Sequence, residues 1–346
     1  MDIDPCVMRL RHLTGALNAY RLYTYSFLSQ VYIPMVESAN TPMAGDRMRW
    51  SIERRLEFIE FRLYWEGKVN RSDLVEFFGI SVPQASADLG RYQEIAPQNL
   101  EYDTKVKSYL ATPRFQPALL RADAQRYLAQ LRSIVDGILP REETWLGWMP
   151  TYEAVPSIAR RVDPEKLRRI LEVIRTRSAV HIEYQSLSRP DPLWRWLTPH
   201  ALAFDGFRWH VRAWCHTRQN FQDFVLARML AVGESKPDEI DVSRDIGWHR
   251  VVTLRIGPHP GLKDAARKAI ELDYGMQDGV LDISTRVCLS FYLERRLGLD
   301  IDPASTRPER QQIVLLNRDE VREERRRVEE LGASRDPQSE KKQPPG

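Results

Sequence analysis

Apolar residues in the first half of the chain recur at helical spacing. Steps of four, three and four separate Ile52, Leu56, Ile59 and Leu63. This stripe predicts a helix that begins near Trp50 and ends at Gly67. A short helix at 71–78 is expected next. Ser81 is then a good N-cap for a third helix, from Val82 to about Gln93.

Alternating runs then replace the helical pattern. Residues 99–110 form two short runs around Asp103 and Thr104, which predicts a β-hairpin. Three helices followed by a hairpin are typical of a winged helix-turn-helix, whose third helix enters the major groove. A further amphipathic helix is expected at 122–137, where it would suit a linker or a dimer contact.

The second half of the chain is predicted to be rich in β-structure. After a helix at 164–175, alternation predicts strands at 179–184, 194–203, 207–214 and 221–226. Asp205 and Gly206 form a tight hairpin turn. Such short strands suit a small, strongly bent barrel. Beyond Asp245 the expected order is a strand at 251–256, a helix at 262–272, a strand at 280–283 and a helix at 287–297, which indicates a small α/β unit.

The patterns divide this α+β multidomain chain into six parts. They are an N-terminal arm (1–45), a winged helix-turn-helix DNA-binding domain (46–115), a helical linker or dimerisation segment (116–162), a β-rich domain (163–235), a C-terminal α/β extension (245–316) and a charged tail (317–346). The arm is either an accessory segment or the result of a start placed upstream of Met43 or Met48. The tail is expected to be disordered, with a solvated helix as an alternative for its first part.

Composition narrows the class of protein. Of 346 residues, 42% are hydrophobic and 29% charged, which suits a chain with a sizeable core. No window of about 20 apolar residues predicts a membrane span, and residues 1–9 lack a secretory pattern. The three cysteines, Cys6, Cys215 and Cys288, are far apart, which favours neither a disulfide framework nor a zinc site. A cytoplasmic protein is expected.

Side chains on the third helix and the wing are the candidates for DNA contact. Gln84, Ser86 and Arg91 supply an amide, a hydroxyl and a guanidinium to the outer face of the helix, which also carries Asp88. In the wing, Lys105 and Lys107 alternate with Val106, so both are expected on one face, within reach of phosphates. The predicted DNA-binding residues are Ser81, Gln84, Ser86, Arg91, Lys105 and Lys107. A three-helix bundle without a DNA role is the alternative, because residues 46–140 hold 14 Lys/Arg against 13 Asp/Glu.

A cationic strand is the second candidate site. Arg208, His210 and Arg212 alternate, so they share one face, expected to be wet, and would repel one another unless an anion lay among them. Arginine forks bind phosphates in bidentate fashion, which favours a pocket for a phosphorylated or nucleotide-like ligand. Ser186 and His200 could add donors, and Arg228 follows a neighbouring strand. The alternative is a surface strand paired with Glu183, Asp205 and Asp223.

Catalytic patterns are lacking. The sequence holds no GxSxG, HExxH or Walker A segment. His210, Cys215 and His216 are close in sequence, but no fourth metal ligand is evident. We therefore expect neither an enzyme, nor a metal, nor a cofactor.

Many short motifs resemble those of the WYL-domain transcription regulators, over residues 50–299. Those that carry the resemblance are Phe58-Ile-Glu60, Trp65-Glu-Gly67, Arg71-Ser-Asp-Leu74, Phe78-Gly-Ile-Ser81, Gln84-Ala-Ser86, Asp88-Leu89, Tyr102-Asp103, Tyr184-Gln-Ser186 and Pro199-His200. Trp209-His210-Val211 stands where the family has Trp-Tyr-Leu. This departure resembles the subgroup of repressors found beside phage-defence clusters of the BREX and CBASS types.

The resemblance implies a fold and a function. It implies a winged helix-turn-helix, a Sm-like small β-barrel (the WYL domain) as ligand sensor, and a homodimer that binds an inverted repeat in double-stranded DNA. A nucleotide or nucleic-acid ligand would relieve repression. The pocket implied by position comprises Tyr184, Ser186, His200, Arg208, His210, Arg212 and Arg228. An accessory protein that binds single-stranded nucleic acid through the WYL arginines is the alternative.

Overall fold

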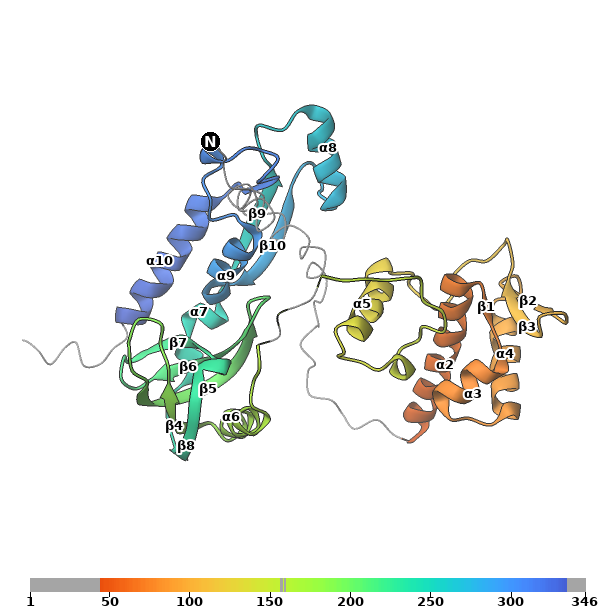
Figure 1. Ribbon diagram of the computed structural model, residues 1–346, viewed down its shortest axis with the longest axis horizontal. Helices are drawn as coiled ribbons and strands as arrows, with labels where there is room; N and C mark the ends of the chain where they lie inside the picture. Colours follow the sequence, from red (N-terminus) through yellow and green to blue (C-terminus); the bar gives the residue numbers. More distant parts are fainter. Residues whose placement is uncertain (1–43, 156–157, 159, 335–346) are drawn as a thin grey trace, which may run out of the picture. The chain divides into compact units, whose positions relative to one another are not determined.

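The computed structural model describes residues 44–155, 158 and 160–334, which fall into two compact units divided after Ser157 (Figure 1). The expected N-terminal arm lies outside the described residues, except for its end, because the first described helix already begins at Ala44. Residues 335–346 of the expected tail also lie outside them. No helix in the described part of the chain combines the length and the apolar character needed to cross a membrane.

The first unit has the expected order of three helices and a hairpin. Its elements are α2 (Ala44–Glu66), β1 (Lys68–Val69), α3 (Arg71–Phe78), α4 (Val82–Ile95), β2 (Leu100–Asp103), β3 (Ser108–Ala111), α5 (Ala124–Val135) and the 3₁₀ turn η2 (Arg141–Glu143). Strand β1, which the sequence did not predict, pairs with β3 and makes a three-stranded antiparallel wing in the order β1-β3-β2.

Local signals place the helix-turn-helix. Asn70 and Asp73 form a capping box at the start of α3, and Gly79 ends that helix in the left-handed conformation at φ 64°. Ser81 then caps α4, since its side chain accepts a hydrogen bond from the Gln84 amide. These caps set the turn between the two helices.

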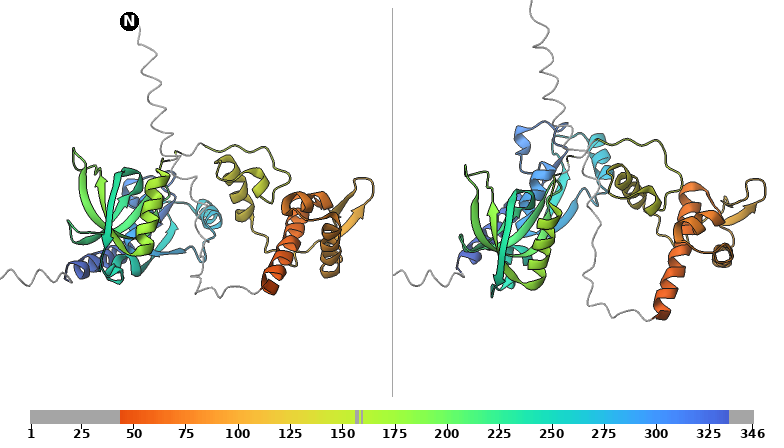
Figure 2. Two further views of the ribbon diagram at one scale, coloured as in Figure 1. Left: turned by 90° about the horizontal axis from the view of Figure 1, so that it is seen from below. Right: turned by 60° about the horizontal axis from the view of Figure 1, so that its bottom comes forward.

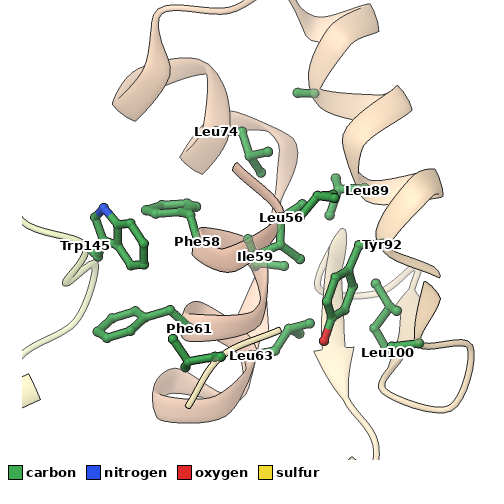
Figure 3. Packing of buried hydrophobic residues seen from close by; sticks show 14 of the residues in the cluster. Leu56, Phe58, Ile59, Phe61, Leu63, Leu74, Leu89, Tyr92, Leu100 and Trp145 are labelled. Carbon is green, nitrogen blue, oxygen red and sulfur yellow. The ribbon is translucent and has the colours of Figure 1, made fainter. Parts of the chain in front are cut away.

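The core of this unit is aromatic. Phe58 and Phe61 on α2 are each 1% exposed, and Trp145, from the connector after α5, packs edge-on against both at 6.0 and 5.5 Å between ring centroids (Figure 3). Burying side chains of this size stabilises the fold by about 1.5–3 kcal/mol each. The connector is therefore part of the core of the first unit.

The second unit contains a β-sheet and a smaller C-terminal part. Its helices and turns are α6 (Pro164–Thr176), η3 (Leu226–Arg228), η4 (Val242–Arg244), α7 (Ile246–His249), α8 (Asp264–Asp273), α9 (Val287–Leu297), η5 (Pro303–Ser305) and α10 (Arg318–Ser334). Its strands are β4 (Ser178–Tyr184), β5 (Leu193–Phe204), β6 (Trp209–Cys215), β7 (Asn220–Val225), β8 (Met229–Pro237), β9 (Val251–Pro258), β10 (Leu281–Arg286) and β11 (Ile313–Leu315).

The five strands β4–β8 form an antiparallel sheet in the order β7-β6-β5-β4-β8. Helix α6 lies along one face of this sheet and buries Ile170 and Val173 against it (Figures 1 and 2). Strands β7 and β8 form its two edges, so the described residues contain no closed barrel, contrary to the Sm-like expectation. Irregular pairing between Pro199 and Ala201 marks a bulge in the sheet.

The C-terminal part is an antiparallel sheet, β10-β9-β11, with helices packed on it. The segment from residue 317, expected to be a disordered tail, forms helix α10 as far as Ser334. Its Val321 is fully buried, and Arg325 pairs with Glu294 of α9. A single buried residue and arginine–glutamate pairs three or four positions apart order this helix despite its low apolar content.

Candidate DNA interface and ligand site

The outer face of helix α4 carries small side chains at its middle. Ala85, Leu89 and Tyr92 are fully buried, whereas Gln84 and Arg91 are exposed. At 100° per residue, Ala87 and Gly90 lie at the middle of the exposed side, between these two polar residues and Ser86. Small residues there let the helix backbone approach a groove floor. Ser86 donates its hydroxyl to the Val82 carbonyl at 3.0 Å, so its oxygen can still accept.

Asp88 does not lie on this outer face, where the sequence placed it. It is 2% exposed and forms an ion pair with Arg55 of α2 at 2.7 Å. Gln84 also donates its amide to Asp88, at 3.0 Å. The negative charge of Asp88, which would repel DNA phosphates on the outer face, is thus buried. It is neutralised by Arg55, which is 33 residues away along the chain.

The wing lysines lie in a loop and not on a strand. The expected two-residue turn at Asp103 and Thr104 is a longer loop, 104–107, between β2 and β3. Asp103 accepts hydrogen bonds from the amides of Lys105 and Val106, and Lys107 adopts φ 51°. Lys105 and Lys107 are both exposed at the tip, so both ammonium groups are accessible to phosphates.

A surface hollow of about 300 Å³ separates the start of α3 from the wing. Its lining comprises Asn70, Arg71, Ser72, Tyr102, Val106, Lys107, Ser108 and Tyr109. The Arg71 guanidinium lies 6.0 Å from the centroid of the Tyr102 ring. Two cations, hydroxyl groups and a helix N-terminus around one hollow suit an anionic group. Sequence reasoning had missed this site, because only the fold brings α3 and the wing together.

The cationic strand is β6, and its polar face is buried. His210 and Arg212 are only 2% and 9% exposed, because helices α7 and α9 of the C-terminal part cover them. The ring centroid of Tyr292 on α9 lies 4.9 Å from that of His210. The expectation of a wet face was therefore wrong: this face is an internal contact between the sheet and the C-terminal part.

Carboxylates pair with Arg208, which directly precedes β6, and with His210 and Arg212 on the strand. Arg208 and His210 both donate to Asp205, at 2.8 and 2.9 Å. Arg212 binds Asp245 through two hydrogen bonds, of 2.7 and 2.8 Å, and also pairs with Asp223 at 3.2 Å. The repulsion that seemed to require a bound anion is thus relieved by the protein itself.

The pKa values of these carboxyls agree with the pairing. Burial alone would raise the pKa of Asp245, but hydrogen bonds from Arg212 and His200 outweigh it and lower that pKa to about 2. Burial likewise opposes ionisation of Asp205, yet hydrogen bonds from His210 and Arg208 hold its pKa well below the usual range. Both carboxyls are ionised at neutral pH.

The seven predicted ligand residues fall into two groups. His200 binds Asp245 at 2.9 Å and so joins Arg208, His210 and Arg212 at the covered face. Tyr184 instead belongs to the core on the α6 side, where its hydroxyl accepts a hydrogen bond from the Val225 amide at 3.1 Å. Ser186 follows Tyr184 in a loop. Arg228 lies next to this loop, because the Arg228 carbonyl accepts a hydrogen bond from the Gln185 amide at 3.1 Å.

Comparison with protein families locates three matches on the chain. They are the BrxR transcriptional regulator winged helix-turn-helix domain (residues 51–133), the WYL domain (165–233) and the BrxR transcriptional regulator C-terminal dimerization domain (251–321). The resemblance indicated by the short motifs is confirmed.

Curated relatives match along most of their length. The DNA-binding transcriptional repressor CapW of Stenotrophomonas maltophilia is 44% identical over 282 residues, which cover 81% of this chain and 94% of that protein. CapW of Pseudomonas aeruginosa is 44% identical over 276 residues, 80% of this chain and 92% of that protein. Among solved structures, proteasome accessory factor B/C of Arthrobacter aurescens covers 94% of this chain and 55% of its own at 15% identity and a TM-score of 0.23, a likeness too low to indicate a shared arrangement.

Proposed function

The chain belongs to the family of winged-helix, WYL-domain transcriptional repressors that includes CapW, and from this premise we propose that it is a homodimeric, sequence-specific repressor of a phage-defence operon. A nucleotide or nucleic-acid ligand at the WYL domain relieves repression. The relatives are DNA-binding transcriptional repressors by name, and an enzymatic activity forms no part of the proposal.

One observation supports DNA recognition by α4 above the others. The helix exposes Gln84 and Arg91, while its central carboxylate, Asp88, is buried against Arg55. An amide can pair with adenine and a guanidinium with guanine in the major groove. The Gln84 side-chain nitrogen donates to Asp88, which fixes the amide at the exposed side of the helix and engages one of its two N–H groups.

Contacts to the DNA backbone are assigned to the wing and the hollow beside it. Lys105 and Lys107 reach phosphates from the loop tip, and Arg71 does so from the start of α3. Such contacts fix the position of the domain without specifying sequence. Two copies, joined through the domain at 251–321, would present two recognition helices to an inverted repeat.

Relief of repression requires a connection between the WYL sheet and the dimerisation domain. The contacts of Arg212 with Asp245 and of Asp223 with Tyr292 supply it, since each joins the sheet to a helix of the C-terminal part. A ligand that binds two dimer arrangements with different affinity shifts operator binding by that difference. The alternative, direct binding of single-stranded nucleic acid by the β6 arginines, is less favoured because Arg212 is saturated by two carboxylates.

A competition gel-shift tests the proposal. Full-length protein is titrated against the DNA upstream of its own gene, with random-sequence DNA as competitor. We expect competitor-resistant binding that weakens when Gln84 and Arg91 are replaced by alanine. Arg168→Ala, which removes an exposed arginine from α6, is the matched control and should bind normally. Wild-type binding no tighter than to random DNA would refute operator recognition.

A further inference from the structure

Arg195 is an arginine on the apolar face of the WYL sheet. It is 9% exposed and lies on the α6 side of β5, opposite Ile182 of β4. Its guanidinium carbon lies 5.5 Å from the centroid of the Tyr184 ring and 5.8 Å from that of Phe224. Within the described residues it has neither an ion pair nor a hydrogen bond, and its Nε is buried without a partner.

A buried cation without a carboxylate is costly. Two aromatic faces offset part of the lost hydration, but the cost of burying an unpaired charge exceeds that gain. The Arg195 terminal nitrogens are not among the buried atoms that lack a partner. They therefore reach solvent, and an external anion can bind them. Arg212, equally buried, binds two carboxylates, whereas Arg195 binds none in the described residues.

The surroundings of Arg195 contain the second group of predicted ligand residues. Tyr184 lies beneath its guanidinium, and Ser186 follows two residues later in the loop. Arg228, half-buried, has no side-chain partner in the described part of the chain and lies beside Gln185 through a backbone hydrogen bond. Two unpaired guanidinium groups and a hydroxyl thus come from adjacent segments, which is the donor set that phosphate prefers.

We propose that Arg195, together with Ser186 and Arg228, forms a phosphate-binding subsite at the β4–β5 end of the WYL sheet. Its occupant is a phosphate group of a nucleotide or of single-stranded nucleic acid. The proposal rests on the proposed ligand response but moves the anion away from the β6 cations, which carboxylates already neutralise. The rings of Tyr184 and Phe224 hold the Arg195 guanidinium in place for the phosphate.

Binding of defined probes to the full-length protein tests the subsite. The probes are inorganic phosphate, thymidine 5′-monophosphate and a short single-stranded oligothymidylate, measured by calorimetry at fixed ionic strength. We expect at least one of them to bind the wild type, and Arg195→Met to weaken that binding tenfold or more. The matched control Arg168→Met removes an exposed arginine and should bind as the wild type does. The probe that binds tells free phosphate from a nucleotide or a strand.

Two outcomes overturn the subsite: no phosphate-bearing probe binds the wild type, or Arg195→Met binds as tightly as the wild type. Thermal unfolding in phosphate against chloride is the second readout. Phosphate should raise the melting temperature of the wild type but not of Arg195→Met, and equal anion effects in the two proteins count against the subsite. If Arg195→Met does not fold, Arg195→Lys, which retains the charge, takes its place and should weaken binding without abolishing it.

Failure of the subsite and failure of the repressor reading are distinguishable. Operator binding without any probe depends on α4 and the wing, so Arg195→Met should give a normal gel-shift. A wild type that binds a probe through Arg195 but does not recognise its operator refutes repression and leaves the subsite in place.

Discussion

Arg212 on β6 binds both carboxylate oxygens of Asp245, the N-cap of α7, at 2.7 and 2.8 Å. This pair joins the WYL sheet to the C-terminal part and is almost wholly buried, with side chains 10% and 1% exposed. Removal of one partner from a buried pair leaves the other charge without compensation. The contact therefore stabilises the junction between the sheet and the C-terminal part, and loss of either partner should destabilise that junction.

Replacement of Arg212 by methionine should destabilise the protein by about 3–5 kcal/mol, because Asp245 and Asp223 are left buried and unpaired. The measurement is the urea midpoint of unfolding of the full chain, followed by a probe in the second unit. Arg255→Met is the control, because its pair with Asp282 is exposed and its loss should hardly change the stability. Equal losses in the two variants would contradict the special role of Arg212.

The low pKa of Asp245 predicts a loss of stability in acid. A carboxyl with a folded pKa of about 2 and an unfolded pKa of about 3.9 stabilises the fold fully above the unfolded value, and this stability is lost as pH falls toward 2. The shift corresponds to about 2.6 kcal/mol. Unfolding midpoints of the wild type and Asp245→Asn should differ most at pH 7 and converge near pH 2. A constant difference would show that ionisation of Asp245 is not the cause.

Local signals in the sequence predicted much of the fold. The helices at 71–78 and 287–297 were placed to the residue, because each ends in a left-handed glycine, Gly79 or Gly298. Strand β1 was missed since two residues carry no periodicity. For the segment of helix α10 the sequence left a disordered tail and a solvated helix open, because the order of this segment depends on Val321 and on a contact with α9 that composition does not reveal.

For the candidate sites, too, local patterns were predictable from the sequence, whereas contacts between distant segments were not. Alternation correctly placed His210 and Arg212 on one face of β6, whereas Arg208, expected on the same strand, lies in the turn directly before it. Whether that face is wet depends on α9, about 80 residues later, and on Asp245, so it was beyond local reasoning. Asp88 likewise turns inward because of Arg55. Arg195 drew no attention in the sequence, since the absence of a partner is visible only in three dimensions.

The wing lysines should determine the salt dependence of DNA binding. Each phosphate contact that is lost lowers the slope of log affinity against log salt by about 0.9. Lys105→Ala combined with Lys107→Ala should thus reduce the slope by about 2 and weaken binding to all sequences alike. Fluorescence anisotropy between about 50 and 200 mM salt measures this slope. Lys268→Ala on α8, an exposed lysine outside the DNA-binding unit, should leave the slope unchanged.

Arg71→Ala tests the hollow beside the wing. We expect weaker binding to operator and random DNA by a similar factor and a slope reduced by about 1, because a phosphate contact carries no sequence information. Gln84→Ala provides the contrast, with a loss confined to the operator. If Arg71→Ala instead changed the preferred sequence at constant salt slope, the residue would contact a base and not a phosphate.

Arg208 separates sensing from DNA binding. It directly precedes β6, its side chain is 28% exposed, more than those of His210 and Arg212, and its carboxylate partner within the described residues is Asp205. Asp205 keeps its hydrogen bonds from His210 and from the amide of Phe207 when Arg208 is removed, so Arg208→Ala should fold. If the covered face transmits the ligand signal, this variant should bind the operator as the wild type does but no longer release it when ligand is added. A gel-shift with the purified variant measures operator binding. A reporter strain measures whether ligand still releases the variant from the operator. Loss of operator binding by folded Arg208→Ala would place the residue in the DNA-binding function and not in sensing.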